Sequence, residues 1–248
     1  MPLLKIALVQ QNCPKGAVAA NLAATADYVR DSTADIICFP EMSLTGYLQP
    51  EEQPEAMLTL ESPEVRDFCL QTAHRPITAV AGLVERNPAG RPYITQIVAS
   101  GGKLVGAYRK VNVAPDERDQ FAAGTDTPVF TVSGVRLGIA VCYDIGHGDL
   151  FDAYARAGAQ LVLLAAAPGL YGEQETRDWD SGFQWWRSEC QRHLASSASR
   201  NGLWIGVCTQ AGRTVDEDFP GGGYLFDPAG TLVAESADDV LLITADIR

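Results

Sequence analysis

Short β-rich runs alternate with helical patterns along the chain, and this alternation limits the possible folds more than any other feature of the sequence. In the first half, strands are predicted at Leu4–Gln10, Asp35–Phe39 and Ile77–Val84. Apolar residues at helical spacing predict helices at Asn21–Asp31, whose first residue can cap it, and at Ser62–Gln71. Strands that alternate with helices favour an α/β fold.

Two short glycine-containing turns predict β-hairpins. Gly101-Gly102 and Ser133-Gly134 each separate two runs of strand-forming residues, and such pairs are strong hairpin signals. The four runs are Thr95–Ser100, Lys103–Tyr108, Val129–Val132 and Val135–Val141. The sheet is therefore expected to be mixed, with antiparallel as well as parallel pairs.

The second half of the chain continues the alternation. Helices are predicted at Asp149–Gly158 and Phe183–Arg200. Further strands are predicted at Gln160–Ala166, Leu203–Thr209, Tyr224–Phe226, Thr231–Glu235 and Val240–Asp246. No stretch has the composition of an interdomain linker, so residues 1–248 are expected to form one domain.

Composition excludes several classes of protein and partner. Hydrophobic residues make up 46% of the chain, which is ordinary globular usage, and no apolar run approaches the roughly 20 residues of a membrane span. A formal charge of −12 disfavours nucleic acid or an anionic membrane surface as partner. The first ten residues predict a strand and not a signal peptide, which indicates a cytoplasmic protein.

The cysteines predict free thiols in a reducing compartment. Their spacing contains no Cys-x-x-Cys pair and no zinc-like cluster, so no metal site is expected. Several lie in apolar runs, where a thiol usually packs as a small hydrophobe. The six are Cys13, Cys38, Cys69, Cys142, Cys190 and Cys208.

Three ionisable groups come directly after predicted strands. Glu41 follows the strand at Asp35–Phe39, Lys110 follows the strand that begins at Lys103, and Cys142 ends an apolar run. Functional groups of α/β proteins gather at the carboxyl ends of strands, where loops form a crevice. Taken singly, each charge could be a solvated loop residue and the thiol a packed one.

Together, the three groups suit nucleophilic catalysis. A thiol is a weak nucleophile until a base or a nearby cation favours the thiolate. Glu41 could be that base, and Lys110 could stabilise negative charge on sulfur or on a substrate oxygen. The backbone N–H of Tyr143 could be a second donor to that oxygen.

Three motifs occur in a fixed order around these residues. They are Phe39-Pro40-Glu41-Met42-Ser43-Leu44-Thr45-Gly46-Tyr47, Tyr108-Arg109-Lys110-Val111 and Gly138-Ile139-Ala140-Val141-Cys142-Tyr143-Asp144-Ile145. They resemble the Glu, Lys and Cys signatures of the nitrilase superfamily of carbon–nitrogen hydrolases. Motif matches are hypotheses that need structural confirmation.

The resemblance implies an αββα sandwich of two mixed sheets flanked by helices, paired with another copy into a homodimer or larger homo-oligomer. It assigns Glu41 as general base, Lys110 as stabiliser of the tetrahedral intermediate and Cys142 as nucleophile. Glu117 fits the position of a further glutamate that many members carry. Tyr47 falls within the first motif and is expected to contact substrate. No cofactor is implied.

One segment departs from the family pattern. Members usually continue Cys-Tyr-Asp towards Phe-Pro-Glu, whereas this chain has Gly146-His147-Gly148-Asp149. Two glycines add backbone freedom, so the shape of the pocket stays open. His147 could form a dyad with Cys142, but because Glu41 already supplies a base, we favour a turn residue or pocket lining.

The segment after Pro168 is expected to overhang the same crevice. Tyr171 and Trp179 could form apolar walls, and the acidic residues between Glu173 and Asp180 would favour a neutral or cationic amide. A solvated loop is the alternative interpretation.

The predicted activity is hydrolysis of a small amide through a cysteine thioester, which releases ammonia and a carboxylic acid. Hydrolysis of N-carbamoyl compounds, hydrolysis of nitriles and acyl transfer to an amine or thiol use the same three residues and stay open. A non-catalytic binding or scaffold protein is a further alternative.

Overall fold

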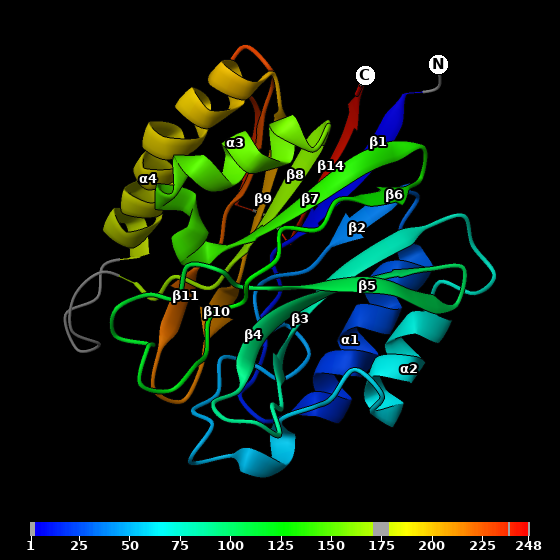
Figure 1. The fold of residues 1–248 in the computed structure, drawn as a ribbon, viewed down its shortest axis with the longest axis vertical. Coiled ribbons are helices and arrows are strands. Elements are labelled where there is room, and N and C mark those ends of the chain that lie inside the picture. Colours follow the sequence, from blue (N-terminus) through cyan, green and yellow to red (C-terminus); the bar gives the residue numbers. More distant parts are fainter. Residues whose placement is uncertain (1–2, 171–178, 238, 248) are drawn as a thin grey trace.

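The computed structural model describes residues 3–170, 179–237 and 239–247. Within these ranges the chain forms four layers in the order helices, sheet, sheet, helices (Figure 1). The strands of the described residues form two six-stranded sheets and one two-stranded ribbon. The predicted αββα sandwich of two mixed sheets in a single domain is therefore confirmed.

The first sheet contains most of the N-terminal half and the last strand. In spatial order its strands are β14 (Val240–Ala245), β1 (Leu4–Val9), β2 (Ile36–Cys38), β3 (Thr78–Glu85), β4 (Tyr93–Ser100) and β5 (Lys103–Arg109). β1, β2 and β3 are parallel, and β14 and β4 run the opposite way. The predicted β4–β5 hairpin turns at Gly101 and Gly102, which both have positive φ.

The second sheet contains most of the C-terminal half. In spatial order its strands are β13 (Leu232–Ser236), β12 (Gly223–Phe226), β9 (Trp204–Thr209), β8 (Leu161–Ala166), β7 (Val135–Val141) and β6 (Phe130–Val132). β7, β8 and β9 are parallel. The predicted β6–β7 hairpin turns at Ser133 and Gly134, with φ of 48° and 77°.

Each sheet has one pair of helices on its outer face (Figure 1). α1 (Val18–Asp31) and α2 (Pro63–Leu70) cover the first sheet, and α3 (Gly148–Arg156) and α4 (Trp179–Asn201) cover the second. Two short 3-10 segments, η1 (Pro54–Ala56) and η2 (Cys142–Gly146), complete the helical elements of the described ranges. No helix in this part of the chain combines the length and apolar character needed to cross a bilayer.

The expectation that Asn21 caps its helix is wrong. The helix begins at Val18, and Asn21 is buried in its first turn. Its amide donates to the backbone oxygens of Pro14 and Leu44 at 3.0 and 3.2 Å. A buried amide needs such partners, and here they tie α1 to the loop that follows β2.

The core consists of three layers of apolar side chains, because alternate residues of each buried strand point to opposite faces. Leu8 and Cys38 face the second sheet, where the Cys38 and Cys208 sulfurs lie 3.3 Å apart. Ala7 and Ile37 face the helices α1 and α2. This packing fixes the two sheets relative to each other.

The carboxyl ends of the central strands of both sheets lie at one end of the sandwich. The end of β2 contacts the end of β9 through the pair of sulfurs named above. β5 runs in the same direction as β3, since both are antiparallel to β4. The residues that follow β2, β5, β7 and β8 therefore meet at the same end.

The short antiparallel ribbon of β10 (Ala211–Arg213) and β11 (Asp218–Pro220) lies outside the predicted strands. Its strands have three residues each and contain Gly, Arg, Asp and Pro, so neither carries a period-two pattern.

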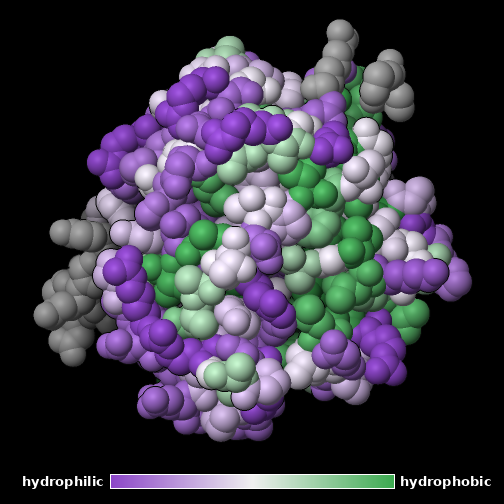
Figure 2. All heavy atoms as spheres, viewed as in Figure 1, coloured by the Kyte–Doolittle hydropathy of each residue, from purple (hydrophilic) through white to green (hydrophobic). Residues whose placement is uncertain are grey.

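Hydrophobic side chains reach the surface on the face that Figure 2 shows, over β5 at the edge of its sheet. Val105 of this strand is 44% exposed. Hydrophilic side chains cover much of the rim of the same face. Single exposed apolar residues are normal in soluble domains, so this edge alone indicates no binding site.

Candidate active site

The loop after β2 holds Glu41 in the interior. Ser43 Oγ accepts a hydrogen bond from the backbone N–H of Gly82 at 2.9 Å, and this bond fastens the loop to β3. A Cβ at Gly82 would lie 2.3 Å from the backbone nitrogen of Met42, so only glycine lets the loop pass this closely. The Glu41 side chain is fully buried as a result.

Lys110 lies between two carboxylates. Its Nζ donates to Glu41 Oε1 at 3.0 Å and to Glu117 Oε2 at 2.8 Å. The exposed fractions of the three residues are 1% for Lys110, 0% for Glu41 and 7% for Glu117. Charged side chains this deeply buried are rare unless they are paired with an opposite charge. Lys110 is paired in this way with both carboxylates.

Glu117 has two further donors. The Tyr47 hydroxyl donates to Oε1, and the backbone N–H of Ala114 donates to Oε2 at 3.1 Å. Burial raises the pKa of Tyr47 well above its usual range, and the negative charges of Glu117 and Glu41 raise it further. Tyr47 therefore stays protonated and acts as a donor.

One carboxyl group of the cluster, that of Glu41, has a pKa near neutral pH. Burial raises the pKa of Glu41 to about 7, although the Lys110 ammonium opposes this shift. Burial by itself would lower the pKa of Lys110, but the facing charges of Glu41 and Glu117 raise it above its usual value. At neutral pH Lys110 is charged, and Glu41 can gain or lose a proton.

Cys142 occupies a strained position at the end of β7. Its φ is 42°, in the left-handed region that non-glycine residues rarely adopt, and it begins the 3-10 segment η2. Among the six cysteines, all of which lie in described ranges, Cys142 alone is partly exposed. Strain of this kind is common at functional sites.

A backbone amide connects Cys142 with the cluster. The N–H of Ala167, directly after β8, donates to Glu41 Oε2 at 3.0 Å. Its hydrogen bonding also lowers the pKa of Cys142, against the effect of burial. Burial and the Glu41 charge raise the pKa of Cys142 well above its usual range, while Lys110 lowers it. Sulfur, carboxylate and ammonium thus share one small site, and the resting sulfur is a thiol.

Asp144, two residues after Cys142, joins the ends of β5 and β7. Its Oδ1 accepts hydrogen bonds from the backbone and side chain of Asn112 at 3.0 and 2.8 Å. Its Oδ2 accepts from the Tyr108 hydroxyl at 2.7 Å and the Val141 N–H at 2.8 Å. We did not predict this role from the sequence. It fixes the backbone around Lys110 relative to Cys142.

A cavity of about 470 Å³ adjoins Cys142. It is lined by residues of η2 and of α4, and by Pro168. From η2 and the residue after it come Tyr143, Ile145, Gly146 and His147, and from α4 come Trp185, Trp186, Glu189, Arg192 and His193. We did not predict the α4 residues of this lining from the sequence, although Trp185, Glu189 and His193 recur every four residues, the spacing of one helix face.

Four predicted substrate-contacting residues have different positions in the structure. Tyr143 and His147 line the cavity, and their rings are 5.3 Å apart. Trp179 begins α4 and lies 5.7 Å from the Arg213 guanidinium, so its contact with substrate stays a prediction. Tyr171 lies outside the described residues.

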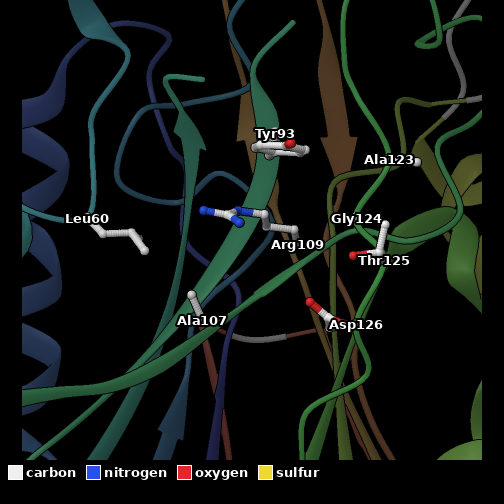
Figure 3. Close-up of a pocket in the computed structure, with 8 residues that line it drawn as sticks. All are labelled: Leu60, Tyr93, Ala107, Arg109, Ala123, Gly124, Thr125 and Asp126. Carbon is white, nitrogen blue, oxygen red and sulfur yellow. The ribbon is translucent and has the colours of Figure 1, made fainter. Parts of the chain in front are cut away.

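A second, smaller cavity of about 250 Å³ lies beside Arg109, the last residue of β5 (Figure 3). The Tyr93 ring lies over the Arg109 guanidinium, 4.7 Å away. The guanidinium donates to both oxygens of Glu85 at 2.6 and 2.7 Å. Asp126 and Leu60 also line this cavity, and none of its described lining residues is a cysteine, serine or histidine.

Within the described ranges, no group of three or more His, Cys, Asp or Glu side chains has an arrangement that could hold a metal ion.

A family model described as carbon-nitrogen hydrolase matches residues 5–248. The chain belongs to the carbon–nitrogen hydrolase family. The resemblance that the three motifs predicted is thus confirmed over nearly the whole length.

This carbon–nitrogen hydrolase is similar to characterised relatives. An (R)-stereoselective amidase of a Pseudomonas species is 25% identical over 95% of this chain and 82% of its own. A glutamine-dependent NAD(+) synthetase of Xanthomonas campestris is 32% identical over 71% of this chain, but the match spans only 33% of that enzyme.

Solved structures show the same fold. An amidase from Nesterenkonia superposes on this carbon–nitrogen hydrolase with a TM-score of 0.79 and 24% identity, over 98% of this chain and 90% of that chain. A glutamate-to-glutamine mutant of that amidase shows covalent addition of the acetamide moiety of fluoroacetamide at its active-site cysteine.

Proposed function

We propose that the protein hydrolyses a small amide through a thioester on Cys142. The observation that carries the proposal is the buried Glu41–Lys110–Glu117 cluster beside the partly exposed thiol. A weak nucleophile needs a base within reach, and an oxyanion needs a cation or N–H donors. The similar amidases support the same chemistry.

In the first step, the Cys142 sulfur attacks the amide carbon while Glu41 accepts the thiol proton. The oxyanion receives hydrogen bonds from Lys110 and from the N–H of Tyr143, at the start of η2, where the first N–H groups have no partner within the helix. The intermediate collapses, the C–N bond breaks, and ammonia leaves with the proton that Glu41 held. A thioester remains on Cys142.

In the second step, water attacks the thioester and Glu41 accepts its proton. The C–S bond breaks, the carboxylic acid leaves, and Cys142 regains its proton from Glu41. Glu117 holds Lys110 and Tyr47 in place through both steps. A carboxylate with a pKa of about 7 can accept and return a proton with little free-energy cost at neutral pH.

Removal of the thiol tests the proposal. Cys142→Ala should lower amide turnover on the order of 10⁴-fold or more, because no nucleophile remains. Ammonia release from a panel of amides is the measurement, and circular dichroism checks the fold. Cys69→Ala is the matched control, since Cys69 is a buried residue of α2 that packs against the first sheet and should be dispensable for activity. Full activity of Cys142→Ala would contradict the scheme.

Product analysis separates the related activities. N-carbamoyl hydrolysis would release carbon dioxide and an amine, nitrile hydrolysis would consume a nitrile, and acyl transfer would give a new product with added hydroxylamine. A scaffold protein would show no selective alkylation of Cys142. Hydrolysis of an amide is the activity that we propose.

The compartment and the assembly are further proposals. All six cysteines, each within the described ranges, are free thiols, which supports a reducing cytoplasm. The family resemblance supports a homodimer or larger homo-oligomer, and the net charge of −12 argues against nucleic acid as partner. Light scattering of the purified protein tests the assembly.

A further inference from the structure

We propose, on the basis of the thioester chemistry above, that the cavity beside Cys142 holds the acyl group of the substrate and that this group is a flat, uncharged aromatic ring. The leaving group of a primary amide is ammonia, so the remainder of the substrate is its acyl group and must lie next to the sulfur. The cavity of about 470 Å³ is within the usual range of roughly 300–1,000 Å³ for small-ligand sites.

Aromatic side chains form two walls of this cavity. The rings of Tyr143 and His147 pack at 5.3 Å, and those of Trp185 and Trp186 at 6.0 Å. Tyr143 remains 38% exposed, so its ring has surface left for a ligand. Rings of this kind favour another ring in offset or edge-to-face contact.

The charged residues in the described part of the cavity lining compensate one another. Glu189 pairs with Arg192 at 2.5 Å and lies 3.5 Å from His193 Nε2. Among the described lining residues, one carboxylate is therefore matched by one guanidinium, and neither a carboxylate nor an ammonium on the acyl group would gain an unpaired opposite charge from them. The lining favours a neutral group.

Gly146 makes room for such a ring. Its φ is outside the left-handed region, and a Cβ added there would meet no atom of the described residues nearer than His193 Cε1 at 4.0 Å. A larger side chain would therefore enter the cavity without backbone strain. This glycine belongs to the segment that departs from the family pattern, and it enlarges the site next to Cys142.

Kinetics with matched amides test the assignment. Wild-type protein should hydrolyse phenylacetamide with a kcat/KM about tenfold or more above that of acetamide, with cyclohexylacetamide between them. Gly146→Leu should lower the ratio of kcat/KM for phenylacetamide to kcat/KM for acetamide about tenfold or more. The control is Gly90→Leu in the β3–β4 turn, where a Cβ also has open space, and both substrates should be unaffected.

Two kinetic outcomes would overturn the proposal. One is a wild-type preference for acetamide over phenylacetamide. The other is an equal effect of Gly146→Leu on both amides, or no effect on either, because a residue that sets cavity size must discriminate by size.

Binding without turnover separates this proposal from the proposed function. Phenylacetamide should change the tryptophan fluorescence of Cys142→Ala protein, and Cys142→Ala/Gly146→Leu should bind it about tenfold or more weakly. Binding by the first variant, with no hydrolysis by the wild type, would retain the cavity assignment and remove the proposed function. Absence of binding would overturn the cavity assignment itself.

Discussion

Lys110 and Arg109 are neighbours in the sequence, yet they belong to two different acid–base clusters at the end of β5. The Lys110 side chain is 1% exposed and faces two carboxylates, whereas the Arg109 side chain is 44% exposed and pairs with Glu85. Arg109 lines a cavity, and Lys110 lies near the partly exposed Cys142. Among the described residues, therefore, only the Lys110 cluster has a thiol beside it.

The comparison shows why composition alone does not identify a reactive site. A guanidinium with one carboxylate, half in water, is satisfied and screened, so its contribution to stability is small. Burial of the Glu41 carboxyl, with a smaller contribution from the negative charge of Glu117, raises the pKa of Glu41 to about 7, which suits proton transfer. We therefore expect changes at Lys110 to affect activity and stability strongly, and changes at Arg109 to affect both weakly.

The largest contrast is expected from Lys110→Met. Removal of the ammonium leaves Glu41 and Glu117 buried without their cation, which should lower the free energy of unfolding by roughly 3–5 kcal/mol. Loss of the oxyanion donor should also lower kcat by about 10²–10³-fold. Urea denaturation and single-turnover kinetics measure the two effects. Near wild-type turnover in this variant would show that the Lys110 ammonium is dispensable for the chemistry.

The pH dependence of activity should follow Glu41. With a pKa of about 7, its base form is lost as the pH falls, so kcat/KM should decrease about tenfold per unit below that value. A profile of kcat/KM from about pH 5 to about pH 9 measures this acidic limb, the part in which activity falls with falling pH. Arg109→Met should retain it unchanged, and a limb that shifted in Arg109→Met would show that the two clusters are coupled.

The same shift predicts a stability effect of defined sign. The pKa of Glu41 is higher in the fold than its ordinary value of 4.5, so its contribution to stability is fully present below pH 4.5 and is lost as the pH rises through about 7. Glu41→Gln should remove this slope from the pH dependence of the unfolding free energy. A slope that persisted in the variant would belong to another group.

A smaller effect is expected from Asp144→Asn. All four hydrogen bonds to Asp144 come from donors, so the NH₂ of asparagine would face two donors across a buried contact. Stability should fall by about 1–3 kcal/mol. We expect kcat to fall by about tenfold or more, with less change in KM, because Lys110 loses its position relative to Cys142. Tyr108→Phe, which removes one donor, should show less of both effects.

The smallest effect is expected from Arg109→Met. The pair with Glu85 is partly exposed, so its loss should cost about 1–2 kcal/mol of stability and change kcat by less than about threefold. The same denaturation and turnover assays apply. A loss of activity as large as that of Lys110→Met would mean that the second cluster contributes to the chemistry.

Much of the fold could be predicted because its signals are local. Glycine pairs with positive φ, such as Gly101-Gly102, fix hairpins, and apolar runs such as Leu161–Ala166 form buried strands. The ribbon of β10 and β11 could not be predicted, since its short polar strands owe their pairing to the loops around them. Asn21 was misassigned because its partners, at Pro14 and Leu44, are set by tertiary packing.

In the candidate site, too, some residues could be predicted from local sequence signals, whereas others depend on tertiary packing. Glu41, Lys110 and Cys142 could be singled out from their places after strands and from motif resemblance, and the structure brings Lys110 to 3.0 Å from Glu41. The role of Asp144 depends on the meeting of β5 and β7, which no local pattern encodes. Which face of α4 lines the cavity likewise depends on how that helix packs.

The most direct test of the account is intact-protein mass spectrometry of samples quenched in acid during turnover of an amide, followed by peptide mapping. We expect an adduct with the mass of the amide less that of ammonia, located on Cys142 and absent from Cys142→Ala. Ammonia release with no adduct, or an adduct on one of the five buried cysteines, would contradict the claim that sulfur, carboxylate and ammonium act together on one carbonyl.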